Sequence, residues 1–502
     1  MLEERVLEIT RKAVSIYSPT NTAAEKDIEQ YLLQVLREMP YFKRNQKLCG
    51  AYELPEDVWQ RSCIYGLVLG KSRRTVIYMG HHDVVDTDVY GSLAEMATQP
   101  ELLAQELQKA DLDEDAEKDL ASGQWLFGRG TCDMKGGTAA QLAVLEEYAK
   151  DPDSGSMLFL SVPDEEAFSA GMRGCLPLLQ ELRERYGLTY ELAVNCEPNS
   201  RENGLQTVYT GTVGKLLPCV LVQGRSVQIG SYYEGVNPVA LLAEIVSRTE
   251  GDRSLVDTEH EEQTVPPVWN FMRDFKSSYD FSLPRRGAAY CNILTYHRQP
   301  AEVLQWLEDK CREAADAAMA KQGSGNSAAV IRYEQLLQKA QERKGFEEFY
   351  QKLQQEMARK LQEEKTDFPA LTLWAMEQVL DFTECDEPLI IIGFAPPYYP
   401  PLSSKRLTKD FVQVERFVQT LLPLKFKNYF MGISDCSYLG AEQEPDSSFS
   451  CNAPAWGKLY SFDSKALAAL QIPFLLLGPW GKDLHRRTER VHIGSLCHAL
   501  PQ

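Results

Sequence analysis

The chain has 502 residues, 44% of them hydrophobic and 25% charged, which is the balance of a globular protein long enough for two domains. Its net charge of −19 at pH 7 argues against nucleic acid or an anionic membrane surface as the main partner, because both demand a basic face. No apolar run approaches the roughly 18 residues of a membrane-spanning helix, and the charged start "MLEERVLEITRKAVSIYSPT" is unlike a secretory signal. The twelve cysteines include no C-x-x-C pair, so we expect a reduced, cytoplasmic protein.

Helices and strands alternate over the first 211 residues. A helix is expected over about 24–39, where Ile28, Leu32 and Val35 share one face. The later elements are strands near 62–69 and 74–80, a long acidic stretch of surface helix and loop at about 87–124, a helix after "DMKGG", a strand at 156–162, a helix around 173–186 and a strand at 191–196. Alternation at these lengths predicts βαβ units and a mostly parallel sheet.

The pattern changes near Gly211. The following segments predict a compact βαββαβ-like unit inserted in the first domain, and a highly charged helical stretch at about 334–380 extends it. Beyond it, residues 401–502 again alternate helix and strand, ending with the strand "IPFLLLG". We therefore expect an α/β fold in which 1–211 and 401–502 form one domain and 212–400 an inserted α+β domain of ferredoxin-like type.

Polar residues of metal-ligand type follow four of the apolar strands in the first domain. These residues are His81 and Asp83, then Asp164, Glu165 and Glu166, then Glu197, and finally His485, with Asp133 standing among glycines between the first two sets. In open α/β sheets, ligand sites form beyond the carboxyl ends of the strands. Acids are rarely buried there unless they are paired or bound to metal. The sequence therefore predicts a metal site at this edge of the sheet.

Two histidines and three carboxylates could hold one metal ion loosely or two well. Two ions roughly 3.5–4 Å apart need a bridging anion, which a carboxylate supplies with one oxygen to each ion. Nitrogen and oxygen ligands suit zinc, although cobalt or manganese would also bind. We therefore expect two divalent ions, with zinc as the first choice.

Five motifs, "GHHDVVD", "GRGTCDMKGG", "PDEEA", "NCEPN" and "GPWGKDLHRRTERV", resemble in order and spacing those of the dinuclear zinc peptidase/deacylase family. That family includes acetylornithine deacetylase, succinyl-diaminopimelate desuccinylase, aminoacylase and glutamate carboxypeptidase. The phrases "GSYYEGVN", "AAYCNILTYHR", "FAPPYYPP" and "GISDCSYLGA" are most similar to the RocB-type arginine-utilisation proteins. The resemblance implies that the first domain is the catalytic domain, with a mostly parallel sheet, and that the inserted domain is its lid.

The resemblance also assigns roles to the residues of the site. It implies two metal-ligand sets, His81, Asp133 and Glu197 for one ion and Asp133, Glu166 and His485 for the other. Glu165 would be the general base that takes a proton from metal-bridging water and passes it to the departing nitrogen. Asp83, two residues beyond His81 on an extended chain, would accept the imidazole N–H, while His82 faces the other way and is expected to pack or to lie at the surface, not to bind metal. The family pattern further implies a cis peptide bond between Asp133 and Met134.

The inserted domain departs from the family pattern at one position. Members of the family usually carry a lid histidine that polarises the substrate carbonyl, often across a dimer interface, and aligning "VQGRSVQIGSYYEGVN" places Gln228 there. A glutamine amide donates a hydrogen bond but carries no charge, so it replaces such a donor only in part. Arg298 is a candidate to clamp a substrate carboxylate, and a plain surface arginine is the equal alternative. Family likeness suggests a homodimer through the inserted domain, although the helices at 334–380 could instead cover that surface.

These features predict a metal-dependent hydrolase of an amide-type C–N bond in a small amino-acid derivative. A peptidase, an N-acyl deacylase and an N-carbamoyl hydrolase use the same attack by metal-bridging water, and the motifs do not separate them. The likeness to RocB-type proteins points toward arginine or ornithine metabolism. The alternative is a catalytically weak metal-binding or regulatory protein of the same fold, which Gln228 favours and the retained Glu165 disfavours.

Overall fold

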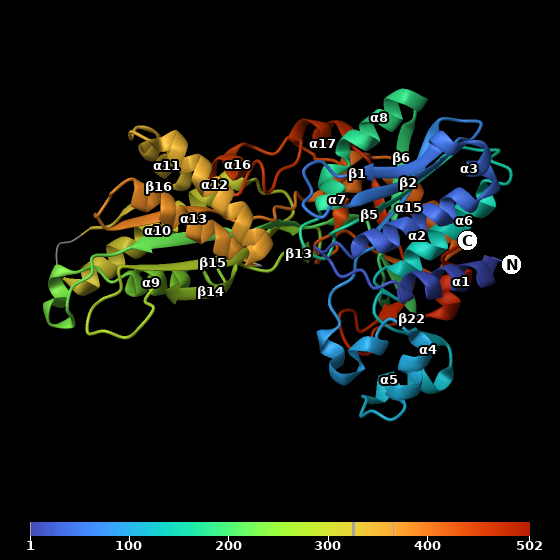
Figure 1. Cartoon of the computed structure of the whole chain (residues 1–502), viewed down its shortest axis with the longest axis horizontal. Helices are drawn as coiled ribbons and strands as arrows, with labels where there is room; N and C mark the ends of the chain where they lie inside the picture. The colour runs from blue at the N-terminus through green and yellow to red at the C-terminus, as the bar shows by residue number, and fades with distance from the viewer. Residues whose placement is uncertain (1, 324–326, 365, 502) are drawn as a thin grey trace. The chain divides into compact units, whose positions relative to one another are not determined.

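The computed structural model describes residues 2–323, 327–364 and 366–501, which form two compact units (Figure 1). Unit 1 comprises the residues up to Thr212, Leu402–Gln443 and the residues from Phe462 onward. Unit 2 comprises Val213–Pro401 and Glu444–Ser461. Among the described residues, no helix combines the length and hydrophobicity that a membrane span requires.

Unit 1 is built on a sheet that has nine strands within the described ranges, in the order β1-β2-β5-β3-β6-β20-β8-β19, with β7 paired to β8. The strands are Cys49–Glu53 (β1), Ser62–Val68 (β2), Arg74–His81 (β3), Ser156–Val162 (β5), Thr189–Asn195 (β6), Arg201–Glu202 (β7), Leu205–Tyr209 (β8), Leu424–Lys427 (β19) and Phe474–Leu476 (β20). β3 lies between β5 and β6 and runs parallel to both, and β20 runs parallel to β6. The carboxyl ends of these four strands therefore meet at one edge of the sheet, where ligand sites form in such folds.

Helices pack on the sheet of unit 1, and α6 packs on two of the strands that lead to this edge. α2 (Glu25–Glu38) packs against β1 and β2 through a face that includes Ile28 and Leu32. α6 (Lys135–Tyr148) packs against β3, β5 and α1 (Leu2–Ser15). The start of α6 needs glycine, because a Cβ on Gly137 would lie 2.4 Å from the carbonyl oxygen of Cys196. Unit 1 also contains the helices Pro40–Arg44 (α3), Ala170–Gly174 (α7), Leu176–Tyr186 (α8), Ser404–Leu407 (α14), Phe411–Leu421 (α15) and Ser464–Leu470 (α17).

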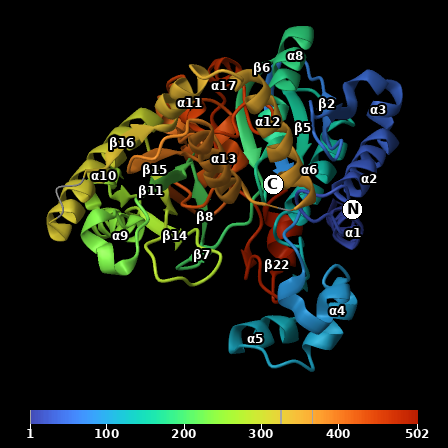
Figure 2. The same ribbon diagram turned by 60° about the vertical axis from the view of Figure 1, so that its left-hand side comes forward.

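A helical segment of unit 1 stands beside a small separate sheet. The segment contains the 3₁₀ stretch Asp88–Met96 (η2), α4 (Pro100–Leu107) and α5 (Glu114–Ser122), and the sheet contains Trp125–Phe127 (β4), Gly481–Lys482 (β21) and Arg490–His492 (β22). Figures 1 and 2 both show α4 and α5 next to β22. The segment has an apolar core of its own, which the expectation of a surface helix and loop missed because its helices are too short for a long apolar period.

The sheet of unit 2 has six strands within the described residues, in the order β10-β15-β11-β17-β16, with β14 on the free side of β15. The strands are Gly214–Leu216 (β10), Pro218–Gln223 (β11), Val268–Asp274 (β14), Arg286–Thr295 (β15), Ala329–Arg332 (β16) and Leu389–Phe394 (β17). The antiparallel order β17-β11-β15-β14, with one helix after β11 and one after β15, is that of a ferredoxin-like unit. The sequence did not predict β14, whose side chains are mostly exposed or half-buried.

The helices of unit 2 pack on this sheet and on one another. α9 (Pro238–Thr249) and α10 (Pro300–Gln322) are the ferredoxin-like pair and pack together. The charged stretch forms α11 (Tyr333–Gln341), α12 (Phe346–Glu363) and α13 (Phe368–Phe382). Both α9 and α13 pack against β11, which is why β11 is buried along its whole length.

One segment differs from the expected division of the chain. Residues Glu444–Ser461 belong to unit 2, although 401–502 was expected to return wholly to the first domain. The Asp446 carboxylate accepts the N–H of Ala301 at the start of α10, and Phe449 stacks on Phe394 of β17. These contacts join residues about 50 to 150 positions apart, so no local pattern in the sequence marks them.

Candidate metal centre

His81, the last residue of β3, is buried at the centre of the edge where the parallel strands end. Its Nε2 lies 3.1 Å from Asp133 Oδ1 and 3.5 Å from Glu197 Oε1. Its Nδ1 lies 3.1 Å from the backbone carbonyl oxygen of Asp83 and 3.4 Å from the Asp83 carboxylate. The backbone carbonyl of Asp83, nearer than the carboxylate that the sequence pointed to, therefore directs the imidazole with Nε2 toward the acids.

The Asp83 carboxylate has a second task in the structure. Its two oxygens accept the backbone N–H groups of Glu165 and Glu166, each at 3.1 Å. Burial alone would raise the pKa of Asp83, but its carboxylate accepts a hydrogen bond from His81, which lowers this pKa to about 2, so Asp83 stays ionised. Asp83 thus orients His81 through its backbone carbonyl and fixes the loop after β5 through its carboxylate.

Asp133 lies in the loop between β4 and α6, and its bond to Met134 is cis, as the resemblance predicted. Its Oδ1 faces His81, and its Oδ2 lies 3.2 Å from Nε2 of His485. Burial alone would raise the pKa of Asp133, but hydrogen bonds from His485 and His81 lower it below the ordinary value. Each oxygen of this carboxylate therefore faces a different imidazole, which is the arrangement of a bridging ligand.

Glu166 and His485 complete the second half of the cluster. Nε2 of His485 lies 3.0 Å from Glu166 Oε1. The hydrogen bonds of His485 with Asp133 and Glu166 raise its pKa to about 10. His485 follows β21 at a φ of 62°, several residues beyond β20, so it is placed by a loop and not by the strand end itself. All five expected metal ligands come from unit 1.

The donor set fits two divalent metal ions. Two groups of three residues have ligand atoms within 4.8 Å of one another, namely His81, Asp133 and Glu166, and His81, Glu165 and Glu197. Burial raises the pKa of Glu197 to about 7 and the pKa of Glu165 well above its ordinary value, with neighbouring carboxylates adding to both shifts. Imidazole nitrogens and carboxylate oxygens are ligands of zinc, cobalt and manganese, and cations would relieve the repulsion among these acids.

The remaining candidates have other surroundings, each within its own unit. His82 is buried with its Nδ1 3.0 Å from Ser161 Oγ, which is the packing role expected of it. In unit 2, Arg298 donates to Asp257 Oδ1 at 2.6 Å and to the carbonyl of Ser254 at 3.0 Å. Gln228 is exposed there at the start of the 3₁₀ stretch Ile229–Glu234 (η3). The contacts of Arg298 hold a loop of unit 2 and give no support to a carboxylate clamp.

Asp435 is a buried acid of the site that sequence reasoning did not assign. It lies in "GISDCSYLGA" and is buried. Burial raises its pKa to about 7, and its charge in turn raises the pKa of Glu165. In the sequence, this acid stands among hydrophobic residues of a motif that resembles the RocB-type proteins. A lone acid in such surroundings was the one signal that could have indicated a site residue.

A second unassigned group, centred on Arg61, holds the loop that carries Glu165. Nη1 of Arg61 donates to Glu25 Oε1 and to Asp164 Oδ1, each at 2.8 Å, and Nη2 donates to Asp57 at 2.7 Å. Glu25 also accepts the backbone N–H of Asp164 at 2.9 Å. The guanidinium is buried, so its loss would leave two buried acids uncompensated.

Replacing Arg61 by methionine should therefore lower the free energy of unfolding by about 3–5 kcal/mol, measured by urea denaturation. Burial raises the pKa of both Glu25 and Asp164, so the folded variant takes up protons as the pH falls, and the loss should be smaller at about pH 5 than at about pH 8. Arg74→Met is the control, since Arg74 and Glu191 form an exposed pair worth less than about 1 kcal/mol. Equal losses for the two variants would contradict the prediction.

Comparison with known proteins agrees with this geometry. The sequence pattern of the family described as "Peptidase family M20/M25/M40" matches residues 107–465. The uncharacterized protein YqjN of Bacillus subtilis (strain 168) is 30% identical over 99% of this chain and 95% of its own length, and protein RocB of the same organism is 29% identical over 99% and 93%. The crystal structure of Bacillus subtilis YxeP, a dinuclear metal-binding peptidase of the M20 family, shares the fold with a TM-score of 0.51 at 11% identity, covering 100% of this chain and 96% of that chain. The chain belongs to peptidase family M20/M25/M40, a family of metallohydrolases.

Proposed function

We propose that this protein hydrolyses an amide-type C–N bond in a small amino-acid derivative. The observation that carries the proposal is the placement of Asp133 between two imidazoles, with Glu165 buried beside them. His81, Asp133 and Glu197 would hold one divalent ion, and Asp133, Glu166 and His485 the other. Zinc is the metal that we propose, with cobalt or manganese as substitutes.

Bound ions would supply Lewis acidity and lower the pKa of coordinated water. The chain's own residues supply the proton transfers. Glu165 Oε accepts a proton from the attacking water and delivers it to the departing nitrogen, and its raised pKa suits a group that must both take and give a proton near neutral pH. The Asp83 carboxylate accepts the backbone N–H of Glu165, which helps to hold Glu165 in position through both proton transfers.

The substrate proposal is a peptide, N-acyl or N-carbamoyl derivative of arginine or ornithine. Its support is the likeness to RocB over nearly the whole chain. Gln228 stands where the family's lid histidine is expected, and its amide would donate to the substrate carbonyl without a charge. A neutral donor at that position should polarise the carbonyl less, so we expect modest turnover.

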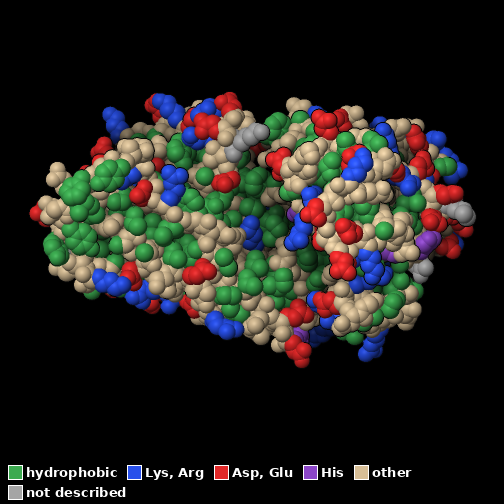
Figure 3. Space-filling view, turned by 90° about the horizontal axis from the view of Figure 1, so that it is seen from below, with side chains coloured by type: hydrophobic (Ala, Val, Ile, Leu, Met, Phe, Trp, Pro, Cys, Tyr) green, Lys and Arg blue, Asp and Glu red, His purple; other side chains and the backbone are tan. Residues whose placement is uncertain are grey.

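A homodimer through unit 2 is a further part of the proposal. β14 is an edge strand, and an unpaired edge offers hydrogen-bonding groups to another chain. Its exposed side chains include Val268 and Met272, and Tyr279 and Phe281 lie in the loop that follows. In Figure 3 hydrophobic side chains gather over the left-hand part of the view, which is unit 2. This exposed apolar surface supports pairing with a second copy.

The proposed activity is tested with a substrate panel. The zinc- or manganese-loaded protein is incubated with the N-acetyl, N-succinyl and N-carbamoyl derivatives of arginine and ornithine, with citrulline and with short dipeptides, and products are read by mass spectrometry. We expect cleavage of one class, because one pocket shape cannot orient all of these carbonyls equally. Absence of cleavage in a protein that binds two metal ions per chain would favour the alternative, a catalytically weak metal-binding protein. Gln228→His would then be the next variant to test for turnover.

A further inference from the structure

Glu489 is a fully buried acid four residues beyond His485. One of its carboxylate oxygens, Oε1, accepts three backbone N–H groups of the loop that ends at Asp133. The distances are 2.7 Å from Gly130 and 3.4 Å from both Cys132 and Asp133. The same short stretch of chain therefore carries one imidazole of the cluster and grips the loop that carries its bridging carboxylate.

The other oxygen of Glu489 forms an ion pair with the Arg129 guanidinium. Arg129 is also buried, and its remaining contacts hold it from a different direction. Its Nε donates to the carbonyl of Asp86 at 3.1 Å, its backbone N–H donates to the carbonyl of Ala97 at 2.8 Å, and its guanidinium lies 5.3 Å from the centre of the Tyr90 ring. Arg129 thus anchors Glu489 to the helical segment of unit 1.

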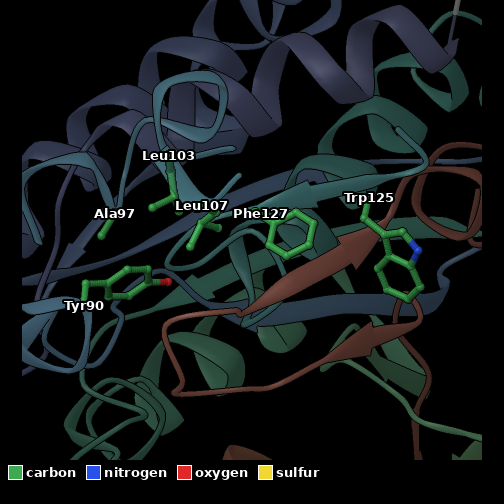
Figure 4. Close-up of a cluster of buried hydrophobic side chains, with 6 residues drawn as sticks. All are labelled: Tyr90, Ala97, Leu103, Leu107, Trp125 and Phe127. Carbon is green, nitrogen blue, oxygen red and sulfur yellow. The ribbon is translucent and has the colours of Figure 1, made fainter. Parts of the chain in front are cut away.

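That segment has an apolar core, and Tyr90, whose ring lies beside Arg129, is part of it. Figure 4 shows Tyr90 and Ala97 grouped with Leu103 and Leu107 of α4, and with Trp125 and Phe127 of β4. A charged hydrogen bond is stronger where water is excluded, because the effective dielectric constant is lower there. The segment that the sequence suggested to be a surface helix and loop therefore contacts the buried Arg129 through Tyr90 and Ala97.

We infer that Glu489, anchored by Arg129 under the helical segment, is a positioning residue that fixes the bridging Asp133 relative to His485 and so sets the affinity of the metal pair. The inference rests on the proposed metal ligands. It predicts that the Arg129–Glu489 pair acts on metal affinity and not only on folding. The reason is that Glu489 Oε1 holds three N–H groups of this loop, one of which is the backbone N–H of Asp133 itself. Carboxylates that orient ligands in this way contribute about 10–100-fold to metal affinity.

The test compares the full-length parent protein with the double variant Glu489→Gln/Arg129→Met. The double variant leaves neither a buried unpaired charge nor a charged anchor for the loop. Cobalt binding is followed by calorimetry and by the visible absorption spectrum of bound Co²⁺, and the thermal unfolding of the metal-free protein is recorded in parallel. We expect cobalt affinity to fall about 10–100-fold with a changed spectrum, while the metal-free variant remains folded. Glu202→Gln is the matched control, since Glu202 pairs with Lys425 and Lys427 at the surface of unit 1.

Glu489→Asp guards against a double variant that fails to fold. It keeps the charge and shortens the side chain by one methylene, so it should weaken cobalt binding in a folded protein. Folded variants that bind cobalt with the parental affinity and spectrum would overturn this inference alone. A parent protein that binds no cobalt would overturn the proposed metal site together with it, and neither result depends on whether any substrate is cleaved.

Discussion

Replacing Glu165 by glutamine should lower turnover by about 10²–10⁴-fold and leave both metal ions in place. Glu165 is buried in one group with His81 and Glu197, and its backbone N–H is held by Asp83 at 3.1 Å. Glutamine has nearly the same shape and makes the same backbone hydrogen bond, so the site keeps its geometry. It accepts no proton from water at neutral pH, and the step that needs a base loses its acceptor.

The measurement is kcat on the substrate found with the panel, together with metal content by mass spectrometry of the dialysed protein. Glu202→Gln, a surface substitution of the same chemistry, should leave both quantities at the parental level. Turnover that survives in Glu165→Gln would show that another group is the base. Asp435, whose buried carboxylate is close enough to raise the pKa of Glu165, would then be the first residue to replace.

Replacing Asp133 by asparagine should reduce the metal content from two ions per chain to one or none and abolish turnover. The two carboxylate oxygens of Asp133 face His81 and His485 separately, at 3.1 and 3.2 Å. An amide has one oxygen to offer, and it carries no charge to balance the second cation, so the two halves of the cluster can no longer share a ligand.

Metal-dependent stability gives a readout that needs no substrate. At a free zinc concentration about 100 times the dissociation constant, binding should stabilise the parent by about 2.7 kcal/mol per site. Asp133→Asn should lose most of this gain, whereas Asp410→Asn, an exposed aspartate before α15, should retain it. An unchanged zinc-dependent rise in the unfolding temperature of Asp133→Asn would contradict the bridging role.

The sequence predicted the family and the α/β fold correctly because both depend on local signals. His81 ends one hydrophobic strand and Glu197 follows another, and parallel strands bring such ends together at one edge of the sheet. Asp133 was found from its glycine-rich motif. The structure brings these residues together with Glu166 and His485 at hydrogen-bonding distance, and their roles as metal ligands remain predictions.

The supporting residues could not be found in this way. Arg61 is 103 positions from Asp164, and Glu489 is 360 positions from Arg129, so only the folded chain shows that they are partners. The orientation of His81 by the backbone carbonyl of Asp83 also escapes sequence reasoning, because spacing predicts where side chains point and not where a carbonyl lies. Edge strands such as β14 have too many exposed positions for a clear alternating pattern.

The position of β20 in the sheet has a consequence for the order in which the protein is made. β20 lies between β6 and β8, although these two strands are close neighbours in sequence and β20 is synthesised only after all of unit 2. Until Phe474–Leu476 leave the ribosome, the strands of unit 1 form two separate groups, β1-β2-β5-β3-β6 and β7-β8-β19. His485 follows later still. A metal pair therefore cannot guide the folding of unit 1 early in synthesis. Unit 2, which interrupts the sequence of unit 1, is synthesised completely before the metal site can form.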